Sequence, residues 1–362
     1  MIGIRDLARQ LDISIGTVSR ALNGKADVNP ATRQRVLEAA ARLGYSPNQS
    51  GRSLRRGQTD LVGVIVPTGP QGALITPVFL SVLDGLRRTL QESRRDLAIF
   101  LQGQDEEIFG SLRRLTERGL VDGLIISNTL RVDPRIDYLV EKRTPFAAFG
   151  RSLSGGDHAW VDPDFESAAA AAVDRLAELG HRRIALVLAT GEMNYMHLIG
   201  ETYLGAMQRH GFDVAPDWLQ TRPAGEGGGA EAGAALIAAD PRPTAVLVSD
   251  ARQVFGLYRA LRESGLEVGR DMSIIGLLPD ASAQAASPSL AMFQTDWTAI
   301  GARLSEALIG EMARLARAPQ SGAAQIVRSG RALQCKTPTM FRPGDSVRRL
   351  AAKGPKARSA PA

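Results

Sequence analysis

The apolar residues at the start of the chain repeat with the period of an α-helix. Ile4, Leu7, Ala8 and Leu11 stand at positions i, i+3, i+4 and i+7, which places them on one face of a short helix. Charged and amide side chains occupy most of the other positions of this stretch. The pattern predicts an amphipathic helix that packs on other elements through its apolar stripe.

A second short helix is predicted directly after the first. Ser14 is a good N-cap for about eight helical residues, Val18 and Leu22 fall on the inner face, and Gly24 stands just beyond the end. The gap of three to four residues between the two helices is the spacing of a helix-turn-helix. In that arrangement the second helix lies in the major groove of DNA, and its first turns reach the base edges.

The third predicted helix has the clearest start signal in the chain. Asn29 is the expected N-cap, Pro30 takes the first helical position, and Gly44 stops the helix. Val36 and Leu43 fall on its inner face. These three helices predict an all-α helix-turn-helix domain over residues 1–46.

A hinge is predicted over residues 47–59, within the sequence YSPNQSGRSLRRGQT. Its five or six possible helical residues are too few to form a stable helix in water. We therefore expect the segment to order only when it packs on DNA or on a dimer partner.

From residue 60 onward, short apolar runs alternate with helical stretches. Runs such as LVGVIVP, DGLIISN, RIALVLA and AVLVSD are continuous, which is typical of parallel strands buried on both faces. The helical stretches between them supply the crossovers of βαβ units, so this part is predicted to be doubly wound α/β with parallel sheets. The runs form two sets, the first ending near Gly150 and the second beginning near Val161, which indicates two lobes.

Basic residues are concentrated at the two ends of the chain. Residues 1–56 carry ten Lys and Arg against four acidic residues, whereas residues 57–341 carry 28 basic and 33 acidic residues. A cationic head on an acidic body is the charge distribution of a phosphate-binding domain joined to a domain that does not bind nucleic acid. Residues 342–362 hold six basic residues against one acid, are rich in Pro and Ala, and are predicted to be a disordered basic tail.

Composition argues against several classes of protein. No apolar run approaches the length of about 18 residues that spans a membrane, and charged residues stand where a signal peptide would be apolar, so we expect a cytoplasmic protein with no membrane partner. The single Cys335 can form neither an intrachain disulfide nor a zinc site. With four histidines and no HExxH, GxSxG or Walker motif, we expect no enzyme activity, no cofactor and no metal. The sequence GEGGGA at Gly225 is interpreted as a flexible loop.

The motifs TVSRALNG, VNPATRQRV, LGYSPN and RSL occur in an order and spacing that resemble the DNA-binding region of the lactose-repressor (LacI/GalR) family of bacterial transcription regulators. Ile15 and Gly16 fall at the variable pair with which family members select operators. Because both are apolar, Arg20 is the expected base contact, with guanine O6 and N7 as its partner. The residues that the resemblance places on the recognition helix are Ser14, Ile15, Gly16, Thr17, Ser19 and Arg20. Those expected to position the helix on phosphates are Thr17, Ser19, Asn23 and Asn29.

The resemblance also assigns a role to the hinge. Leu54 falls where the family's hinge leucine wedges into the minor groove and kinks the central base step. Arg52 and Arg55 flank it and are expected on the DNA backbone. From the pattern alone, Leu54 packing on the neighbouring domain and the arginines forming a solvated surface remain open.

The sequence after the hinge, from VGVIVP through WVDPDFESA to DMSIIG, is similar to the family's effector domain, which has the two-lobed fold of periplasmic sugar-binding proteins. The resemblance implies a domain over residues 60–341 in which the chain crosses between the lobes three times. The first lobe is expected at about 60–160 and 290–325, and the second at about 161–289. Ligands of such sheets bind at the carboxyl ends of the strands, here in the cleft between the lobes. The implied ligand is a small-molecule effector, a sugar or sugar derivative.

Two polar anchors common in the family are missing. The alignment places Ile199 where members hold the ligand with an arginine, and Leu278 where they use an aspartate. Unpaired sugar hydroxyls would cost about 1 to 3 kcal/mol each. Three explanations stay open: an unusual effector held by other groups, an alignment displaced by a few residues, or a pocket no longer in use.

Other polar and aromatic residues are candidates for holding the effector, although each can equally be an ordinary surface or core residue. Asp162 and Asp250 are favoured because each follows an apolar strand at its carboxyl end. The complete set is Phe79, Asp162, Asn194, Tyr195, His197, Asp250, Asp296 and Trp297.

The leading hypothesis is a sequence-specific transcription regulator, a repressor, that acts as a homodimer on a pseudopalindromic double-stranded DNA operator and answers to an effector. One alternative keeps the DNA-binding role but gives it a degenerate or protein-responsive effector domain. The other is a solute-binding or enzymatic α/β protein to which the basic head is incidental.

Overall fold

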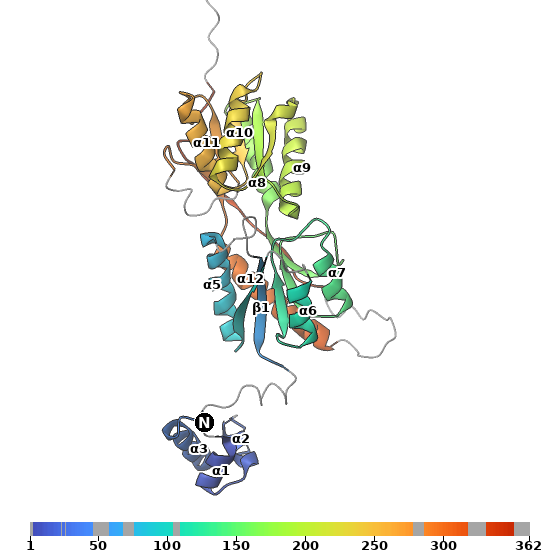
Figure 1. Ribbon diagram of the computed structural model, residues 1–362, viewed down its shortest axis with the longest axis vertical. Helices are drawn as coiled ribbons and strands as arrows, with labels where there is room; N and C mark the ends of the chain where they lie inside the picture. Colours follow the sequence, from blue (N-terminus) through green and yellow to red (C-terminus); the bar gives the residue numbers. More distant parts are fainter. Residues whose placement is uncertain are drawn as a thin grey trace, which may run out of the picture. The chain divides into compact units, whose positions relative to one another are not determined.

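The computed structural model describes residues 3–22, 24–25, 27–45, 58–67, 76–103, 109–277, 286–317 and 331–350. The chain divides into two compact units, Met1–Thr59, called the head, and Asp60–Ala362, called the body. Both are drawn in Figure 1.

In the residues of the head that the structure describes, three helices are present, and local signals fix their ends. Ser14 caps the second helix, its Oγ accepting a hydrogen bond from Thr17 N at 3.0 Å. Asn29 caps the third, its Oδ1 accepting from Ala31 N at 2.8 Å. The helices are α1 (Ile4–Leu11), α2 (Ile15–Leu22) and α3 (Pro30–Arg42).

A small apolar core joins the three helices of the head. Leu7 of α1, Val18 of α2 and Val36 of α3 are each fully buried. Leu22 and Leu43 pack against this cluster and stay partly exposed. All members of the cluster belong to the head, so the stability of the head depends on contacts within it.

The first lobe of the body is a six-stranded sheet in the order β11-β5-β4-β3-β1-β2, and every strand pair in it is parallel. Helices lie on both sides of this sheet (Figure 1), and its central strands, β3 and β4, are buried. The elements are β1 (Leu61–Pro67), α5 (Pro77–Glu92), β2 (Asp96–Gln102), α6 (Gly110–Glu117), β3 (Gly123–Ile126), α7 (Pro134–Glu141), β4 (Phe146–Phe149), β5 (Ala159–Pro163), α12 (Trp297–Arg317) and β11 (Gln334–Thr337).

The second lobe is also a six-stranded sheet, in the order β12-β10-β9-β8-β6-β7, with only β12 antiparallel to its neighbour. Two apolar clusters cover its two faces. The elements are α8 (Phe165–Glu178), β6 (Ile184–Ala189), α9 (Asn194–Arg209), η1 (Pro216–Trp218), β7 (Leu219–Arg222), α10 (Glu226–Ala238), β8 (Ala245–Val248), α11 (Ala251–Glu263), β9 (Ser273–Gly276), β10 (Ala291–Gln294) and β12 (Met340–Arg342).

The chain passes between the lobes three times, from β5 to α8, from β10 to α12, and from β11 to β12. The predicted fold class, a helical head with a two-lobed doubly wound body, is therefore confirmed. The boundaries differ from the predicted ones. Residues 161–163 and 334–337 belong to the first sheet, and 291–294 belong to the second, because strand pairing and not the resemblance decides where each run lies.

The prediction that disorder begins at residue 342 is wrong for the described part of the tail. Ser346 is fully buried, donates from Oγ to Ile274 O at 2.7 Å and accepts from Ala291 N at 2.8 Å. Leu350 N donates to Leu179 O at 2.9 Å. Composition revealed the basic and small residues of this segment but not these distant partners. Residues 351–362 lie outside the described residues.

The GEGGGA sequence is not a loop, since α10 begins at Glu226. A Cβ added at Gly229 would lie 2.0 Å from Gln253 O of α11, so only glycine allows the two helices to approach this closely. Helices α5 and α12 approach each other closely in the same way, since a Cβ at Gly301 would lie 2.0 Å from Val82 O.

Candidate functional site

The exposed face of α2 is the candidate DNA-binding surface of the head. Val18 and Ala21 are buried on its inner face, whereas Ser14, Gly16 and Arg20 are exposed, and Ile15 is 41% exposed. The three residues between α1 and α2 include Asp12 in the left-handed conformation (φ 54°), which makes the tight turn. The geometry is that of a helix-turn-helix in which the outer face of the recognition helix is exposed.

The polar groups on this face differ in how firmly they are held. Ser14 Oγ and Thr17 Oγ1 lie 2.9 Å apart, so the two hydroxyls are hydrogen-bonded to each other at the start of α2. Arg20 Nε lies 3.6 Å from Asp27 Oδ2, and the two side chains are 53% and 63% exposed. An ion pair this exposed contributes little to stability, so Arg20 can exchange Asp27 for a base or a phosphate at small cost.

The remaining predicted DNA contacts fall into two groups. Ser19 is partly buried on α2, and Asn29 is exposed where it caps α3. The others lie outside the described residues: Asn23, Arg52, Leu54 and Arg55.

In the body, a pocket of about 150 Å³ lies where the two lobes meet. The first lobe supplies residues at the carboxyl ends of β3, β4 and β5, together with Val78 of α5 and Trp297 of α12. The second lobe supplies the first residues of α8 and α9. This is the position at which parallel α/β sheets bind ligands. The lining residues are Val78, Asn128, Thr129, Phe149, Gly150, Asp162, Phe165, Tyr195 and Trp297.

Two aromatic pairs form much of the pocket wall, one from each lobe. In the first lobe the Phe149 and Trp297 rings meet edge to face, with centroids 6.4 Å apart. In the second lobe the Phe165 and Tyr195 centroids are 5.3 Å apart. Rigid aromatic walls of this kind suit the apolar faces of a sugar ring or a planar ligand.

Asp162 is the one carboxylate among the described residues that line the pocket, and it is 2% exposed. Burial raises its pKa to about 7, against the opposing effect of Arg151, whose Nε donates to Asp162 Oδ2 at 2.9 Å. Partial burial also acts to raise the pKa of Glu166, but hydrogen bonds from Arg151 and Lys336 outweigh it and lower that pKa to about 2. Glu166 therefore stays charged beside the pocket.

Tyr195 presents a protonated hydroxyl. Burial raises its pKa, and the negative charge of Asp250 adds to the effect. Asp250 itself caps α11, its Oδ1 accepting from Arg252 N at 2.9 Å, and its carboxylate also pairs with the Arg252 side chain. The structure thus places Asp250 near Tyr195 but engaged with its own helix.

Asn194 links the two lobes beside the pocket. It is 5% exposed, its Nδ2 donates to Arg151 O at 2.9 Å, and its backbone N donates to Thr129 O at 2.9 Å. Among the predicted effector residues, the structure thus brings Asp162, Tyr195 and Trp297 together, with Asn194 adjacent.

Other predicted effector residues lie elsewhere. Phe79 is buried in the core of the first lobe, and its neighbour Val78 lines the pocket. His197 is exposed on α9, and Asp296 is exposed where its Oδ1 accepts from Ala299 N. Of the two residues at the missing anchors, Ile199 is fully buried in the core of the second lobe, and Leu278 lies outside the described residues.

Sequence reasoning missed several pocket residues for which it had a signal. Asn128 and Thr129 follow β3, and Phe149 and Gly150 stand at the end of β4, so the carboxyl-end rule that selected Asp162 also applies to them. Phe165 was missed because an aromatic residue at the start of a helix looks like core.

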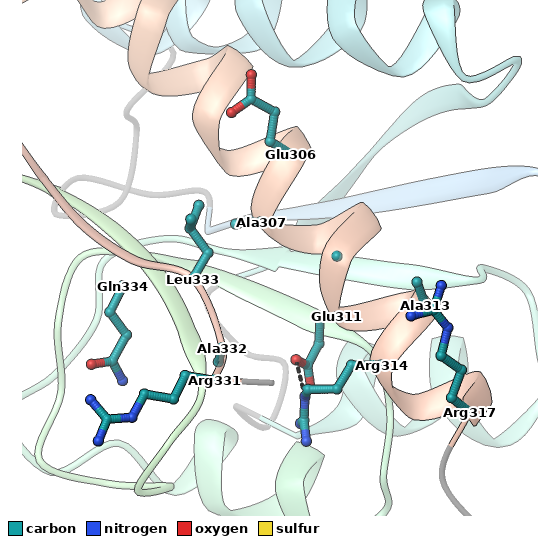
Figure 2. A pocket seen from close by; sticks show the side chains of 11 residues that line it. Glu306, Ala307, Glu311, Ala313, Arg314, Arg317, Arg331, Ala332, Leu333 and Gln334 are labelled. Atoms are coloured by element: carbon teal, nitrogen blue, oxygen red, sulfur yellow. Dashed lines mark hydrogen bonds and ion pairs between the residues drawn. The ribbon is translucent and has the colours of Figure 1, made fainter. Parts of the chain in front are cut away.

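A larger cavity, of about 610 Å³, lies in the first lobe between α12 and residues 331–334 (Figure 2). Arg314 and Arg317 are among its lining residues, and Arg314 is paired with the buried Glu311. This cavity adjoins Gln334, the first residue of β11, and so lies at the amino end of the sheet. Because ligands of such sheets bind at the carboxyl ends, the smaller pocket is the candidate effector site.

Within the described ranges, no three His, Cys, Asp or Glu side chains are grouped so that they could hold a metal ion. The helices of these ranges also include none with the length and hydropathy that a membrane crossing requires.

Comparisons with known proteins agree with this architecture. The family described as "Bacterial regulatory proteins, lacI family" matches residues 3–48, and "Periplasmic binding protein-like domain" matches residues 173–329. The HTH-type transcriptional regulator AglR of Rhizobium meliloti is 32% identical over 316 residues, which cover 85% of this chain and 87% of AglR.

Two solved structures share the fold. The Lac repressor dimer bound to operator and the anti-inducer ONPF has a TM-score of 0.79 at 20% identity, covering 97% of this chain and 99% of that one. The complex of the transcriptional regulator CelR with cellobiose has a TM-score of 0.68 at 23% identity, covering 96% and 100%.

A helix-turn-helix head on a two-lobed body with a pocket between the lobes defines a DNA-binding transcription regulator. With the relationship to AglR over most of both chains, the particular family follows: this chain belongs to the LacI family of bacterial regulatory proteins.

Proposed function

We propose that the chain is a repressor whose binding to a pseudopalindromic operator is controlled by a small molecule held between its lobes. The observation that carries the proposal is the occurrence in one chain of an exposed recognition helix and an aromatic-walled pocket at the lobe junction. The fold shared with an operator-bound Lac repressor dimer supports it. The DNA-binding domain of the head is taken as residues 1–46 and the hinge as residues 47–59.

In this proposal Arg20 reads a base, since its exposed guanidinium has only a weak partner in Asp27. Thr17 and Ser19 contact phosphates from the same helix, and Ile15 offers an apolar contact to a thymine methyl group. The hinge, with Leu54 as its minor-groove wedge, completes the interface.

The proposed effector is a carbohydrate or a derivative of one. Two aromatic pairs can cover the apolar faces of a sugar ring, and Asp162 can accept hydrogen bonds from its hydroxyls. In the described part of the chain, the Asn128 side chain and the Tyr195 hydroxyl have no hydrogen-bond partner, so both remain available to a ligand. The fold relative CelR was solved with cellobiose, which supports this class.

One observation favours the second candidate, a DNA-binding regulator whose effector domain answers to a protein or to nothing. The pocket of about 150 Å³ is smaller than the typical 300 to 1,000 Å³ of ligand sites. Its carboxylate, Asp162, is also already bonded to Arg151.

A homodimer is proposed to form through α5 and β2. β2 is an edge strand of the first sheet, and Ile99 and Leu101 on it are 46% and 57% exposed. Leu80 of α5 is 52% exposed, and a groove of about 500 Å³ runs between the helix and the strand. Exposed apolar residues along an unpaired edge favour burial against a second copy, and a two-fold dimer would match a two-fold operator.

The test of DNA recognition is a fluorescence-anisotropy titration against DNA from upstream of the chain's own gene and its neighbours, at several salt concentrations, with scrambled DNA as the control. A site preferred by about 10³ or more over the scramble supports a specific regulator. Equally weak, steeply salt-dependent binding to both DNAs indicates phosphate contact only and contradicts the proposal.

Thermal shift against a panel of sugars and sugar phosphates separates the two candidates. A ligand at 100 times its dissociation constant adds about 2.7 kcal/mol to the free energy of unfolding. If no compound raises the melting temperature while operator binding is specific, the second candidate is favoured.

A further inference from the structure

Arg151, which follows β4 in the first lobe, uses all three of its guanidinium nitrogens. Nε donates to Asp162 Oδ2 at 2.9 Å, NH1 donates to Glu166 Oε1 at 2.7 Å, and NH2 donates to Glu166 Oε2. The guanidinium carbon also lies 5.5 Å from the centre of the Trp160 ring. The side chain is 15% exposed, so these bonds are formed largely out of water.

The two carboxylates that share Arg151 belong to different parts of the body. Asp162 is in β5 of the first lobe and lines the pocket. Glu166 is in the first turn of α8, and Phe165, the first residue of that helix, packs in the core of the second lobe. One guanidinium therefore touches both the candidate ligand site and the other lobe.

A second cation of the first lobe holds the same glutamate. Lys336 of β11 donates from Nζ to Glu166 Oε1 at 2.8 Å. β11 and β5 are neighbouring strands and both lead into crossings between the lobes. The angle between the lobes is thus set beside a cluster of four charged residues, here named the interlobe clamp: Arg151, Asp162, Glu166 and Lys336.

Another ion pair also joins the lobes, and it offers a contrast. Arg131 NH1 lies 2.6 Å from Glu201 Oε1 of α9, but the side chains are 39% and 59% exposed. Glu166 is 26% exposed and is held in bidentate fashion by Arg151. Water screens the exposed pair, whereas removing one partner from a largely buried pair leaves a charge without compensation.

We propose that Arg151 is a positioning residue that fixes α8, and with it the second lobe, relative to the first, and that couples occupancy of the pocket to the angle between the lobes. A ligand that hydrogen-bonds Asp162 changes the hydrogen bonding of one of the two carboxylates that share the Arg151 guanidinium. It thereby changes how firmly Arg151 binds Glu166. The inference rests on the proposed function only for its link to DNA binding.

Distance measurements between spin labels in the full-length protein test the clamp without ligand or DNA. Labels at Arg118 of the first lobe and Gln208 of the second, both exposed, are placed in a Cys335→Ser background. Glu166→Gln removes the charge at nearly constant size, and Glu201→Gln is the matched control on the exposed pair.

The expected result is that Glu166→Gln shifts or broadens the distance distribution beyond its wild-type width, while Glu201→Gln leaves it unchanged. Arg151→Lys should give a distance distribution between those of the wild type and Glu166→Gln, because an ammonium lacks the planar fork that holds two carboxylates. A distribution for Glu166→Gln identical to that of Glu201→Gln overturns the inference. If Glu166→Gln does not fold, Lys336→Gln decides instead, with a smaller shift in the same direction expected.

Operator affinity without effector gives the second readout. Glu166→Gln should change it about fivefold or more, the usual range for coupling between two sites, and Glu201→Gln by less than twofold. If the wild-type protein recognises no operator, the proposed function fails, and the distance measurement still decides whether Arg151 sets the lobe angle. If operator binding is specific but unchanged in Glu166→Gln, the link between the clamp and DNA is wrong.

Discussion

The head should depend on single core residues far more than the body does, and Leu7→Ala measures this. Leu7 is fully buried among the three helices. Replacing a fully buried leucine with alanine costs about 2 to 5 kcal/mol. At about 0.05 to 0.15 kcal/mol per residue, the helical domain of the head, roughly 45 residues, has only about 2 to 7 kcal/mol of stability in total. Leu7→Ala should therefore leave much of the head unfolded at 25 °C and lower the affinity for both specific and nonspecific DNA.

The assay pairs DNA anisotropy with two probes of unfolding. Trp160, Trp218 and Trp297 all lie in the body, so tryptophan emission follows the body alone, whereas circular dichroism follows both units. Leu37→Ala is the matched control, because Leu37 is 45% exposed on α3 and should cost about 0.5 kcal/mol or less. The reasoning is refuted if Leu7→Ala binds DNA like Leu37→Ala, or if it lowers the melting temperature seen by tryptophan emission.

Three further changes test separate parts of the structure. Arg20→Ala should weaken operator binding by about 1 to 3 kcal/mol in anisotropy titrations and leave binding to scrambled DNA nearly unchanged; an equal loss on both would mean that Arg20 contacts phosphate only. Burial lowers the pKa of His158 below its ordinary value of 6.5, so the unfolded chain binds the proton first and the free energy of unfolding should fall as pH drops below about 6.5. In urea titrations between pH 5 and 7, His158→Phe should reduce the dependence of the free energy of unfolding on pH. An unchanged pH dependence would assign it to other groups. Gly301→Ala should lower the free energy of unfolding by about 1 to 3 kcal/mol, because the added Cβ would collide with Val82 O. Gly310→Ala on the same helix has open space around it and should raise the free energy of unfolding by up to about 1 kcal/mol. Equal melting temperatures for the two variants would contradict the close packing at Gly301.

The features that could be predicted from sequence are those fixed by neighbouring residues. The N-caps at Ser14 and Asn29 act within three residues of themselves, so the helices of the head follow from the local pattern. The alternation of apolar runs with helical stretches likewise indicated the doubly wound body. Asp162 was found because its position at the end of a strand is itself a local property.

The features that escaped prediction depend on residues far apart in the sequence. Arg151 reads as one surface arginine among many until the fold places it beside Glu166, and Lys336 reaches that glutamate from 170 residues away. The glycines near Gly229 look like a loop because the helix that requires them, α11, begins more than twenty residues later. Burial of Ser346 likewise depends on strands that composition cannot place.

The interleaving of the lobes has a consequence for how the protein is made. The backbone O of Asp162 in β5 accepts a hydrogen bond from Thr337 of β11, 175 residues later. At about 5 to 20 residues per second, a ribosome needs roughly 10 to 35 s to synthesise that interval. During this time the head can already fold, but the edge of β5 that later pairs with β11 stays unpaired, and so does the edge of β10 that pairs with β12. A nascent chain stalled before residue 334 would therefore carry a finished DNA-binding head on a body in which both sheets remain open, a form exposed to aggregation and in need of chaperones.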